Sequence, residues 1–164
     1  LKPRVDKAGD KSLVVAFDYL QIAAAVLAGK DSVKASVDEI VLRLKNFQRD
    51  NNATLIVISS FNRQNYWQPV SFESFKESGG IEYGCDGLFG LQCDVDYRRA
   101  SGGEDDEGVV RERIAKMSRQ ATRSVKLVCL KNRNGAPFDV GFTYHAAFDY
   151  FEPAKEKVAQ GMRR

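Results

Sequence analysis

The sequence predicts an α/β fold in which parallel strands come first and an antiparallel hairpin comes last. Two observations support this prediction. Two continuous apolar runs, Leu13–Asp18 and Thr54–Ser59, flank an amphipathic segment. A strand–helix–strand unit of this length is a parallel crossover. Near the end of the chain, apolar runs are separated by turn residues instead of helices, which indicates antiparallel pairing.

The two early runs, "LVVAFD" and "TLIVIS", do not alternate apolar with polar residues. They therefore predict strands that are buried on both faces, as in a parallel sheet. Asp18 ends the first strand, at the carboxyl edge where open α/β sheets bind ligands. The stretch "AGKDS" (Ala28–Ser32) resembles the end of a phosphate loop. Asp31 stands where that loop needs Ser or Thr, so we expect an ordinary loop.

The segment between the strands, Ser32–Asp50, predicts a helix. Its apolar residues recur at three- and four-residue spacing and so share one face: Val33, Val37, Ile40, Val41, Leu44 and Phe47. Ser36 and Glu39 have capping-box spacing, which leaves a start one turn later open. Asn51-Asn52 ends the helix.

The remaining elements are shorter. The pattern predicts helical pieces at Ser71–Glu77, Gly79–Tyr83 and Val110–Gln120, and a flexible polar loop at Ala100–Gly108. Strands are predicted at Leu88–Leu91, Val125–Lys131, Phe138–Tyr144 and Ala147–Phe151, with a turn at Asn132–Pro137. Because there is neither an internal repeat nor a linker, residues 1–164 are expected to form one domain.

Composition fits a globular protein of the cytoplasm. Of the 164 residues, 43% are hydrophobic and 29% are charged. No apolar run approaches the eighteen or so residues that span a bilayer, and we see no secretory signal. The three cysteines lack C-x-x-C spacing and there is one histidine, which argues against structural zinc. We expect reduced thiols and no membrane partner.

The net charge of +3 is unevenly spread. An acidic block, Glu104–Glu107, is followed by a basic stretch between residues 111 and 133. Its members are Arg111, Arg113, Lys116, Arg119, Arg123, Lys126, Lys131 and Arg133. Such a stretch can attract phosphates, or it can be a solvated face, and charge alone leaves both interpretations open.

Four segments occur together in this order: "FDYLQIAA" (17–24), "VISSFNRQNY" (57–66), "SFESFKESGGIEYGCDGLFGLQ" (71–92) and "LKNRNGAP" (130–137). With them the chain resembles the C-terminal ATPase domain of DnaB-type replicative DNA helicases, in a phage or mobile-element variant. The resemblance runs from about Leu13 to Phe151. It implies a RecA-like core, ATP and Mg²⁺ as cofactors, and a hexameric ring that translocates on single-stranded DNA. It also implies a primase or a loader as a candidate partner.

In that family the phosphate loop and the catalytic glutamate precede the "DYLQ" strand, and this sequence holds neither before Leu13. We therefore expect the C-terminal half of a RecA-like P-loop ATPase core, beginning just before the Walker B strand and inactive alone. Without the phosphate-loop strand, the apolar edge of 54–60 is expected to pair with 87–91 or with another copy. A non-enzymatic nucleic-acid-binding or assembly module that retains half of such a core is the alternative.

The resemblance also assigns roles near the nucleotide. It implies that Asp18 organises Mg²⁺ through water. Arg63 corresponds to a basic residue near the nucleotide. Ser60 stands where the family commonly has a glutamine that senses the γ-phosphate, and a serine reaches less far.

Two further groups of residues follow from the resemblance. Lys76, Glu77 and Gly79 correspond to the arginine, glutamate and glycine of a DNA-contacting segment. Lys131 and Arg133 correspond to a basic pair that reaches across the subunit interface, Arg133 as an arginine finger. They alternate on a strand end, so we expect both side chains to point to the same side.

Overall fold

The structure is a computed structural model that describes residues 13–28, 32–75, 78–97 and 106–154. The chain divides into two compact units. The first unit consists of the described residues of 1–61 and 75–85. The second unit consists of those of 62–74 and 86–164. Each unit is described by itself below.

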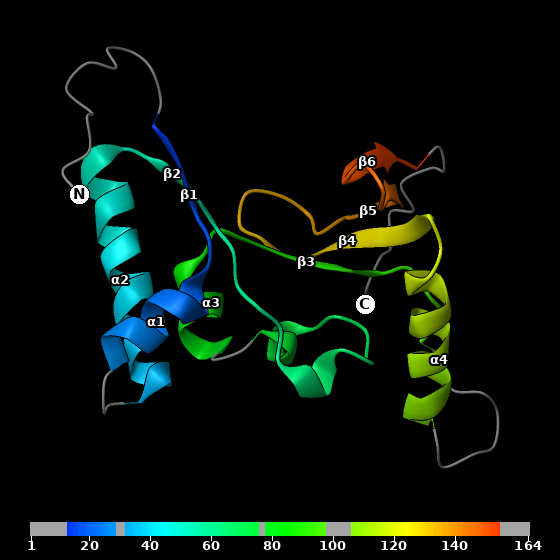
Figure 1. Cartoon of the computed structure of the whole chain (residues 1–164). Helices are drawn as coiled ribbons and strands as arrows, with labels where there is room; N and C mark the ends of the chain where they lie inside the picture. The colour runs from blue at the N-terminus through cyan, green and yellow to red at the C-terminus, as the bar shows by residue number, and fades with distance from the viewer. Residues whose placement is uncertain (1–12, 29–31, 76–77, 98–105, 155–164) are drawn as a thin grey trace. The chain divides into compact units, whose positions relative to one another are not determined.

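The first unit contains a parallel crossover (Figure 1). Strands β1 (Val14–Phe17) and β2 (Thr54–Val57) pair in parallel, with Val14 opposite Thr54 and Phe17 opposite Val57. The chain between them forms helices α1 (Leu20–Ala28) and α2 (Val33–Asn51), and α3 (Ser78–Gly84) packs beside α2. The predicted strand–helix–strand unit is confirmed.

The ends of α2 follow from its terminal residues. Ser32 is the N-cap, and Ser36 lies inside the helix, where its hydroxyl donates to the Ser32 carbonyl at 3.4 Å. The later start with a capping box at Ser36 and Glu39 is therefore wrong. Asn52 ends the helix with a left-handed backbone at φ 46°, a conformation that asparagine tolerates better than most residues.

Helix α1 was not predicted from the sequence. Its residues, "LQIAAAVLA", are apolar on nearly every face, so they lack the periodicity of a half-exposed helix. Leu20 and Ala24 on α1 and Val37 and Ile40 on α2 are all at least 94% buried and form the core between the two helices. Burial of that shared apolar surface, not intrinsic helix periodicity, fixes α1 in place.

The expectation that both early strands are buried on both faces is wrong. Val14 is 59% exposed and Ile56 is 54% exposed. Within the part of the chain that is described, β1 and β2 pair only with each other, whereas β3 pairs with β4. Direct pairing of 54–60 with 87–91 is therefore also wrong. Strand side chains project from the two faces of a sheet, and within the described residues no further layer buries both faces of β1 and β2.

Two glycines let α3 approach α2 closely. A Cβ added at Gly80 would collide with the Asp38 side chain, and one at Gly84 would collide with the Val41 side chain. Both glycines lie on α3 at a spacing of four residues, so they share one face of the helix. The backbone of α3 therefore lies directly against the Asp38 and Val41 side chains of α2.

The second unit is a four-stranded antiparallel sheet in the order β3-β4-β5-β6 (Figure 1). Its strands are β3 (Gly87–Cys93), β4 (Thr122–Asn132), β5 (Asp139–His145) and β6 (Tyr150–Pro153). Helix α4 (Asp106–Ser118) precedes β4, and two 3₁₀ turns, η2 (Arg63–Asn65) and η3 (Phe72–Ser74), lie in the segment before Phe75. The antiparallel end of the fold is confirmed.

Three boundaries differ from the prediction. Residues Asp106–Gly108 belong to α4 and not to a loop, while 100–105 lie outside the described residues. An acidic residue such as Glu107 is compatible with the first turn of a helix, but the sequence pattern alone did not indicate that a helix begins here. The last strand begins at Tyr150 and not at Ala147, because Ala146–Asp149 forms the turn and Asp149 has φ 49°. Of the predicted helical piece Ser71–Glu77, the described residues 71–75 form only the short turn η3, and residues 76–77 lie outside the described residues.

Candidate functional site

Asp18 lies where the sequence places it, directly after β1 at the carboxyl end of the parallel pair, and its side chain is exposed. Main-chain hydrogen bonds join the two strand ends beside it. The Ile58 N–H donates to the Phe17 carbonyl at 2.9 Å, and the Leu20 N–H donates to the Ile58 carbonyl at 2.9 Å. The loop that carries Asp18 is therefore fixed to the end of β2.

Gln21 makes a second connection at the same edge. Its amide Nε2 donates to the Ser59 hydroxyl at 2.8 Å, and its Oε1 accepts from the Ser60 N–H at 3.0 Å. The side chain is 8% exposed, so both bonds are shielded from water. Asp18 and Ser60 are thus held at one edge of the parallel pair, and their roles at a nucleotide stay predictions.

Gln21 lies within the segment "FDYLQIAA", but no role for it was predicted from the sequence. A signal was available, because Gln21 is the single polar residue of "LQIAAAVLA". A buried amide needs hydrogen-bond partners, and the turn after the next strand is the nearest source of them at a sheet edge. Neither Ser59 nor Ser60 could be named as the partner without coordinates.

Arg63 is exposed in η2, whose N-cap is Asn62. The Asn62 side chain accepts from the Gln64 N–H at 3.3 Å, which fixes the start of this turn. Arg63 belongs to the second unit, whereas Asp18 and Ser60 belong to the first. Its role near a nucleotide stays a prediction.

Of the three predicted DNA-contacting residues, Lys76 and Glu77 lie outside the described residues. Gly79 lies in the first turn of α3, and a Cβ added there would meet no atom within 4 Å. The space beside its backbone is therefore open. The DNA role of these three positions stays a prediction.

Lys131 and Arg133 do not share a strand. Lys131 is in β4, opposite Leu88, and Arg133 lies in the turn that follows β4. The predicted alternation of Lys131 and Arg133 along one strand end is therefore wrong, because Arg133 has left the extended backbone. The guanidinium of Arg133 instead pairs with Asp86 at 2.5 Å, a partner that sequence reasoning did not identify.

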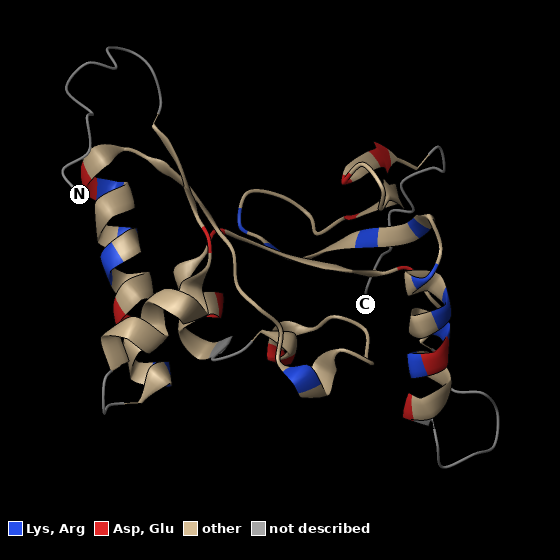
Figure 2. Ribbon diagram, viewed as in Figure 1, with Lys and Arg blue, Asp and Glu red and all other residues tan. Residues whose placement is uncertain are grey.

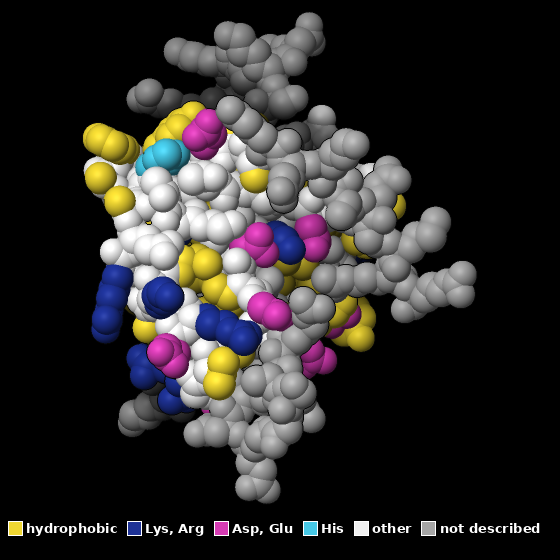
Figure 3. Space-filling view, turned by 90° about the vertical axis from the view of Figure 1, so that its right-hand side faces the viewer, with side chains coloured by type: hydrophobic (Ala, Val, Ile, Leu, Met, Phe, Trp, Pro, Cys, Tyr) yellow, Lys and Arg dark blue, Asp and Glu magenta, His cyan; other side chains and the backbone are white. Residues whose placement is uncertain are grey.

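The basic stretch is distributed over α4, β4 and the turn after it (Figure 2), and Figure 3 shows a face on which Lys and Arg side chains gather. Several of these basic side chains contact acidic or aromatic side chains within the second unit. Arg111 lies 5.0 Å from the Trp67 ring and 3.4 Å from Glu107, and Lys126 lies 3.2 Å from Asp94. These basic side chains therefore already have partners within the unit, which favours the solvated-face interpretation over one continuous phosphate-binding patch.

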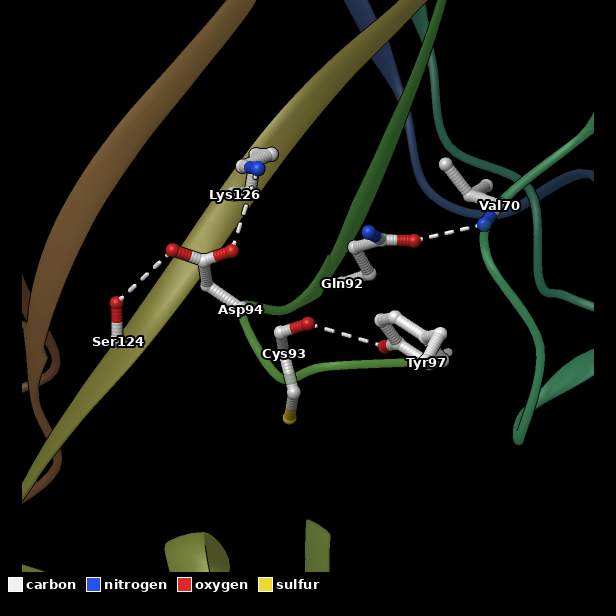
Figure 4. A network of polar contacts seen from close by, with 7 residues as sticks. All are labelled: Val70, Gln92, Cys93, Asp94, Tyr97, Ser124 and Lys126. Atoms are coloured by element: carbon white, nitrogen blue, oxygen red, sulfur yellow. Dashed lines mark hydrogen bonds and ion pairs between the residues drawn. The ribbon is translucent and has the colours of Figure 1, made fainter. Parts of the chain in front are cut away.

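A polar network ties the segment before η3 to the sheet (Figure 4). The Gln92 side chain accepts from the Val70 N–H at 2.7 Å, and the Tyr97 hydroxyl donates to the Cys93 carbonyl at 3.0 Å. Asp94 contacts Lys126 and the Ser124 hydroxyl. Burial raises the pKa of Tyr97 to about 12. Burial also raises the pKa of the Cys93 thiol, against the opposing charge of Arg123.

The residues at the β1 edge fit a magnesium ion held mainly by water. A carboxylate is the ligand type that Mg²⁺ prefers, and the ion commonly keeps several waters and binds one or two carboxylates together with phosphates. Asp18 supplies one exposed carboxylate. Among the described residues, no group of three or more His, Cys, Asp or Glu side chains is arranged to enclose a metal.

Two solved structures have the same fold. One is described as an ATPase domain, with a TM-score of 0.64 and 20% identity over 89% of this chain and 46% of that one. The other is described as "The Structure Of A DnaB-Like Replicative Helicase And Its Interactions With Primase". Its TM-score is 0.63, with 21% identity over 87% of this chain and 30% of that one. The fold is thus that of a RecA-like helicase ATPase domain, and the chain spans less than half of either structure.

The family model of the DnaB-like helicase C terminal domain matches residues 2–153. The chain therefore belongs to this family, and the resemblance drawn from its four segments is confirmed. We found no similar sequence among curated proteins. None of the helices in the described ranges is both long and apolar enough to cross a bilayer. Cys85, Cys93 and Cys129 are all free thiols, as expected.

Proposed function

We propose that this chain is part of the ATPase motor of a replicative DNA helicase. In this proposal Asp18 and Ser60 face the nucleotide of their own subunit, and Arg133 acts on the nucleotide of a neighbouring subunit in a ring. The observation that carries the proposal is the double hydrogen bond of Gln21. It holds the Asp18 and Ser60 loops together at the carboxyl edge of the parallel strands, where open α/β sheets bind ligands.

In the motor, Asp18 would hold Mg²⁺ through water, and the ion, when bound, neutralises charge on the nucleotide phosphates. Ser60 would donate or accept at a shorter reach than a glutamine. Arg63 would add positive charge near the nucleotide. Lys76, Glu77 and Gly79 would contact single-stranded DNA through its backbone, without reading its sequence. A primase or a loader is the partner that we propose for the assembled ring.

The phosphate loop, G-x-x-x-x-G-K-[ST], is absent from these 164 residues. That loop supplies the backbone N–H groups and the lysine that grip the β- and γ-phosphates. Calorimetry of this chain alone with Mg-ATP should therefore show no micromolar binding. A saturable isotherm in clean protein would contradict our account of where the nucleotide is held.

The test of the motor needs this chain joined to a phosphate-loop segment, as in the longer helicase chains that it resembles. Arg133→Ala should then leave nucleotide binding intact and lower hydrolysis by about three to five powers of ten. Asp18→Ala should also abolish hydrolysis. Mixing the two variants should restore part of the activity, because some interfaces then pair an intact Asp18 with an intact Arg133.

The alternative, a non-enzymatic assembly module, gives a different result. The joined protein would then hydrolyse no ATP above the uncatalysed background, so neither substitution would have an activity to lower. If the subunits exchange and mixing restores nothing, Arg133 does not act across an interface.

A further inference from the structure

Asp86 and Arg133 are held together by two independent contacts within the second unit. The Arg133 N–H donates to the Asp86 carbonyl at 2.8 Å, which continues the ladder one step beyond the Gly87–Asn132 pair. The side chains add an ion pair, with Arg133 Nη1 donating to Asp86 Oδ1 at 2.5 Å. The main-chain bond fixes the backbone position of Arg133, and the ion pair fixes the direction of its guanidinium.

The turn that carries Arg133 is fixed on its other side as well. The Asn132 side chain donates to the Ala136 carbonyl and accepts from the Asn134 N–H, both at 3.2 Å. The Gly135 N–H donates to the Asn132 carbonyl at 3.4 Å. The backbone of residues 132–136 is thus closed on itself. The rotatable bonds of the Arg133 side chain are therefore the main freedom left in this turn, and Asp86 restricts them.

The ion pair is poorly placed to stabilise the fold. The Arg133 side chain is 53% exposed and the Asp86 side chain is 41% exposed. Exposed pairs contribute little to stability because water screens them and ordering two side chains costs entropy. A pair that adds little stability can still direct a guanidinium. The ion pair uses one nitrogen, and a guanidinium has five N–H donors, so others remain for an oxyanion.

We propose that Asp86 is a positioning residue that orients the Arg133 guanidinium for the neighbouring subunit's phosphate. This inference rests on the proposed function, because it requires Arg133 to act as a finger. An arginine that must bridge two subunits loses reactive geometry when its side chain samples many rotamers. A misplacement of about 1 Å can cost about a hundredfold in rate. By holding the guanidinium in one orientation, Asp86 avoids this loss of rate before the subunits meet.

The test uses Asp86→Asn in the protein that joins this chain to a phosphate-loop segment. The amide keeps the size of the side chain and leaves the main-chain bond in place, but it removes the charge that holds the guanidinium. We expect kcat for ATP hydrolysis to fall by about tenfold to a hundredfold while nucleotide affinity stays within about twofold. Asp94→Asn is the matched control, because Asp94 pairs with Lys126 in the same sheet. It should change kcat by less than about twofold.

The decisive comparison repeats Asp86→Asn in the Arg133→Ala background. A residue that acts only through Arg133 has nothing left to position there, so the double variant should be no slower than Arg133→Ala alone. If Asp86→Asn slows both backgrounds by the same factor, the residue acts elsewhere and the inference is wrong. If it leaves kcat unchanged or raises it in the parent, the inference is also wrong.

Mixing experiments supply a readout that a general structural defect would not give. Asp86→Asn subunits should regain activity when mixed with Asp18→Ala subunits, and should gain none with Arg133→Ala subunits. Asp86→Glu, which keeps the charge, should recover part of the lost kcat and guards against misfolding of the amide variant. If Arg133→Ala alone leaves hydrolysis intact, the finger and this inference both fail. That outcome is distinct from a failure of Asp86 alone.

Discussion

The two sheets of this protein differ in how far the apolar side chains of their strands are buried. The parallel pair β1–β2 leaves Val14 and Ile56 more than half exposed, and the core of its unit lies among the helices. The antiparallel sheet β3–β6 buries Val125, Val128 and Cys129 on its long central strand. Antiparallel strands can pair with their sequence neighbours through short turns. Parallel strands need connections and covering layers supplied from elsewhere in the chain.

The largest expected effect tests where the stability of the first unit lies. Leu20→Ala removes a side chain that is 1% exposed between α1 and α2, and it should lower the free energy of unfolding by about 2–5 kcal/mol. Leu42→Ala is the matched control, because Leu42 on α2 is 62% exposed. The control should cost less than about 1 kcal/mol. Urea unfolding of both variants checks this, and equal losses would show that the helix core is not the source of stability.

A second comparison concerns two amide side chains, the buried Gln21 and the half-buried Gln92. Gln21 makes two hydrogen bonds in the first unit, and Gln92 makes the 2.7 Å bond to the Val70 N–H in the second. Gln21→Leu should cost about 2 kcal/mol, and Gln92→Leu about 1 kcal/mol. Both substitutions keep the approximate volume of the side chain. Thermal unfolding followed by circular dichroism measures the difference, and a larger loss for Gln92→Leu would reverse this ranking.

Self-association tests the consequence of the open parallel edge. An exposed apolar strand recruits another strand, so we expect this chain to associate with itself through the β1–β2 sheet. Ile56→Lys places a charge on that sheet and should weaken association about tenfold, or about 1.4 kcal/mol. Phe148→Lys is the control, because Phe148 is 83% exposed in a turn and not on a strand edge. Sedimentation velocity over a concentration series checks this, and equal weakening by both variants would contradict it.

The smallest effect is a pH dependence confined to the second unit. Burial raises the pKa of Tyr97 to about 12, above its ordinary value of about 10. A group with a raised pKa adds stability that is complete below its unfolded value and is lost as the pH rises toward the folded value. Stability should therefore decline between about pH 10 and 12, and less so in Tyr97→Phe. Ultraviolet difference spectra should show one fewer late-ionising tyrosine in Tyr97→Phe than in the parent, because the Asp149 hydrogen bond also raises the pKa of Tyr144.

Much of the fold could be predicted, because the two halves carry different patterns. Continuous apolar runs around an amphipathic segment predict the parallel crossover, and turn residues predict the antiparallel end. The burial of β1 and β2 could not be predicted, since it depends on which strands surround them. Helix α1 escaped prediction because it is apolar on nearly all sides.

The candidate site was predictable only where a residue follows directly from its position in a segment. The place of Asp18 follows from the end of its strand, and the turn of Arg133 follows from "NRNGAP". The residues that these loops contact could not be predicted from the local sequence. Gln21 reaches Ser59 across 38 residues, and Arg133 reaches Asp86 across 47. Contacts at such separation depend on the folded geometry and leave no local spacing to detect.

The close contact of α3 with α2 at Gly80 and Gly84 has a mechanical consequence. Gly79, at the start of α3, belongs to the segment that we propose contacts DNA. Since α3 meets α2 backbone to side chain, and α2 shares a dense core with α1, these helices form a stiff assembly. Asp18 lies just before α1. If Gly79 contacts DNA and Asp18 lies beside the nucleotide, as we propose, a pull on the DNA would be transmitted through α3, α2 and α1 as a displacement of Asp18.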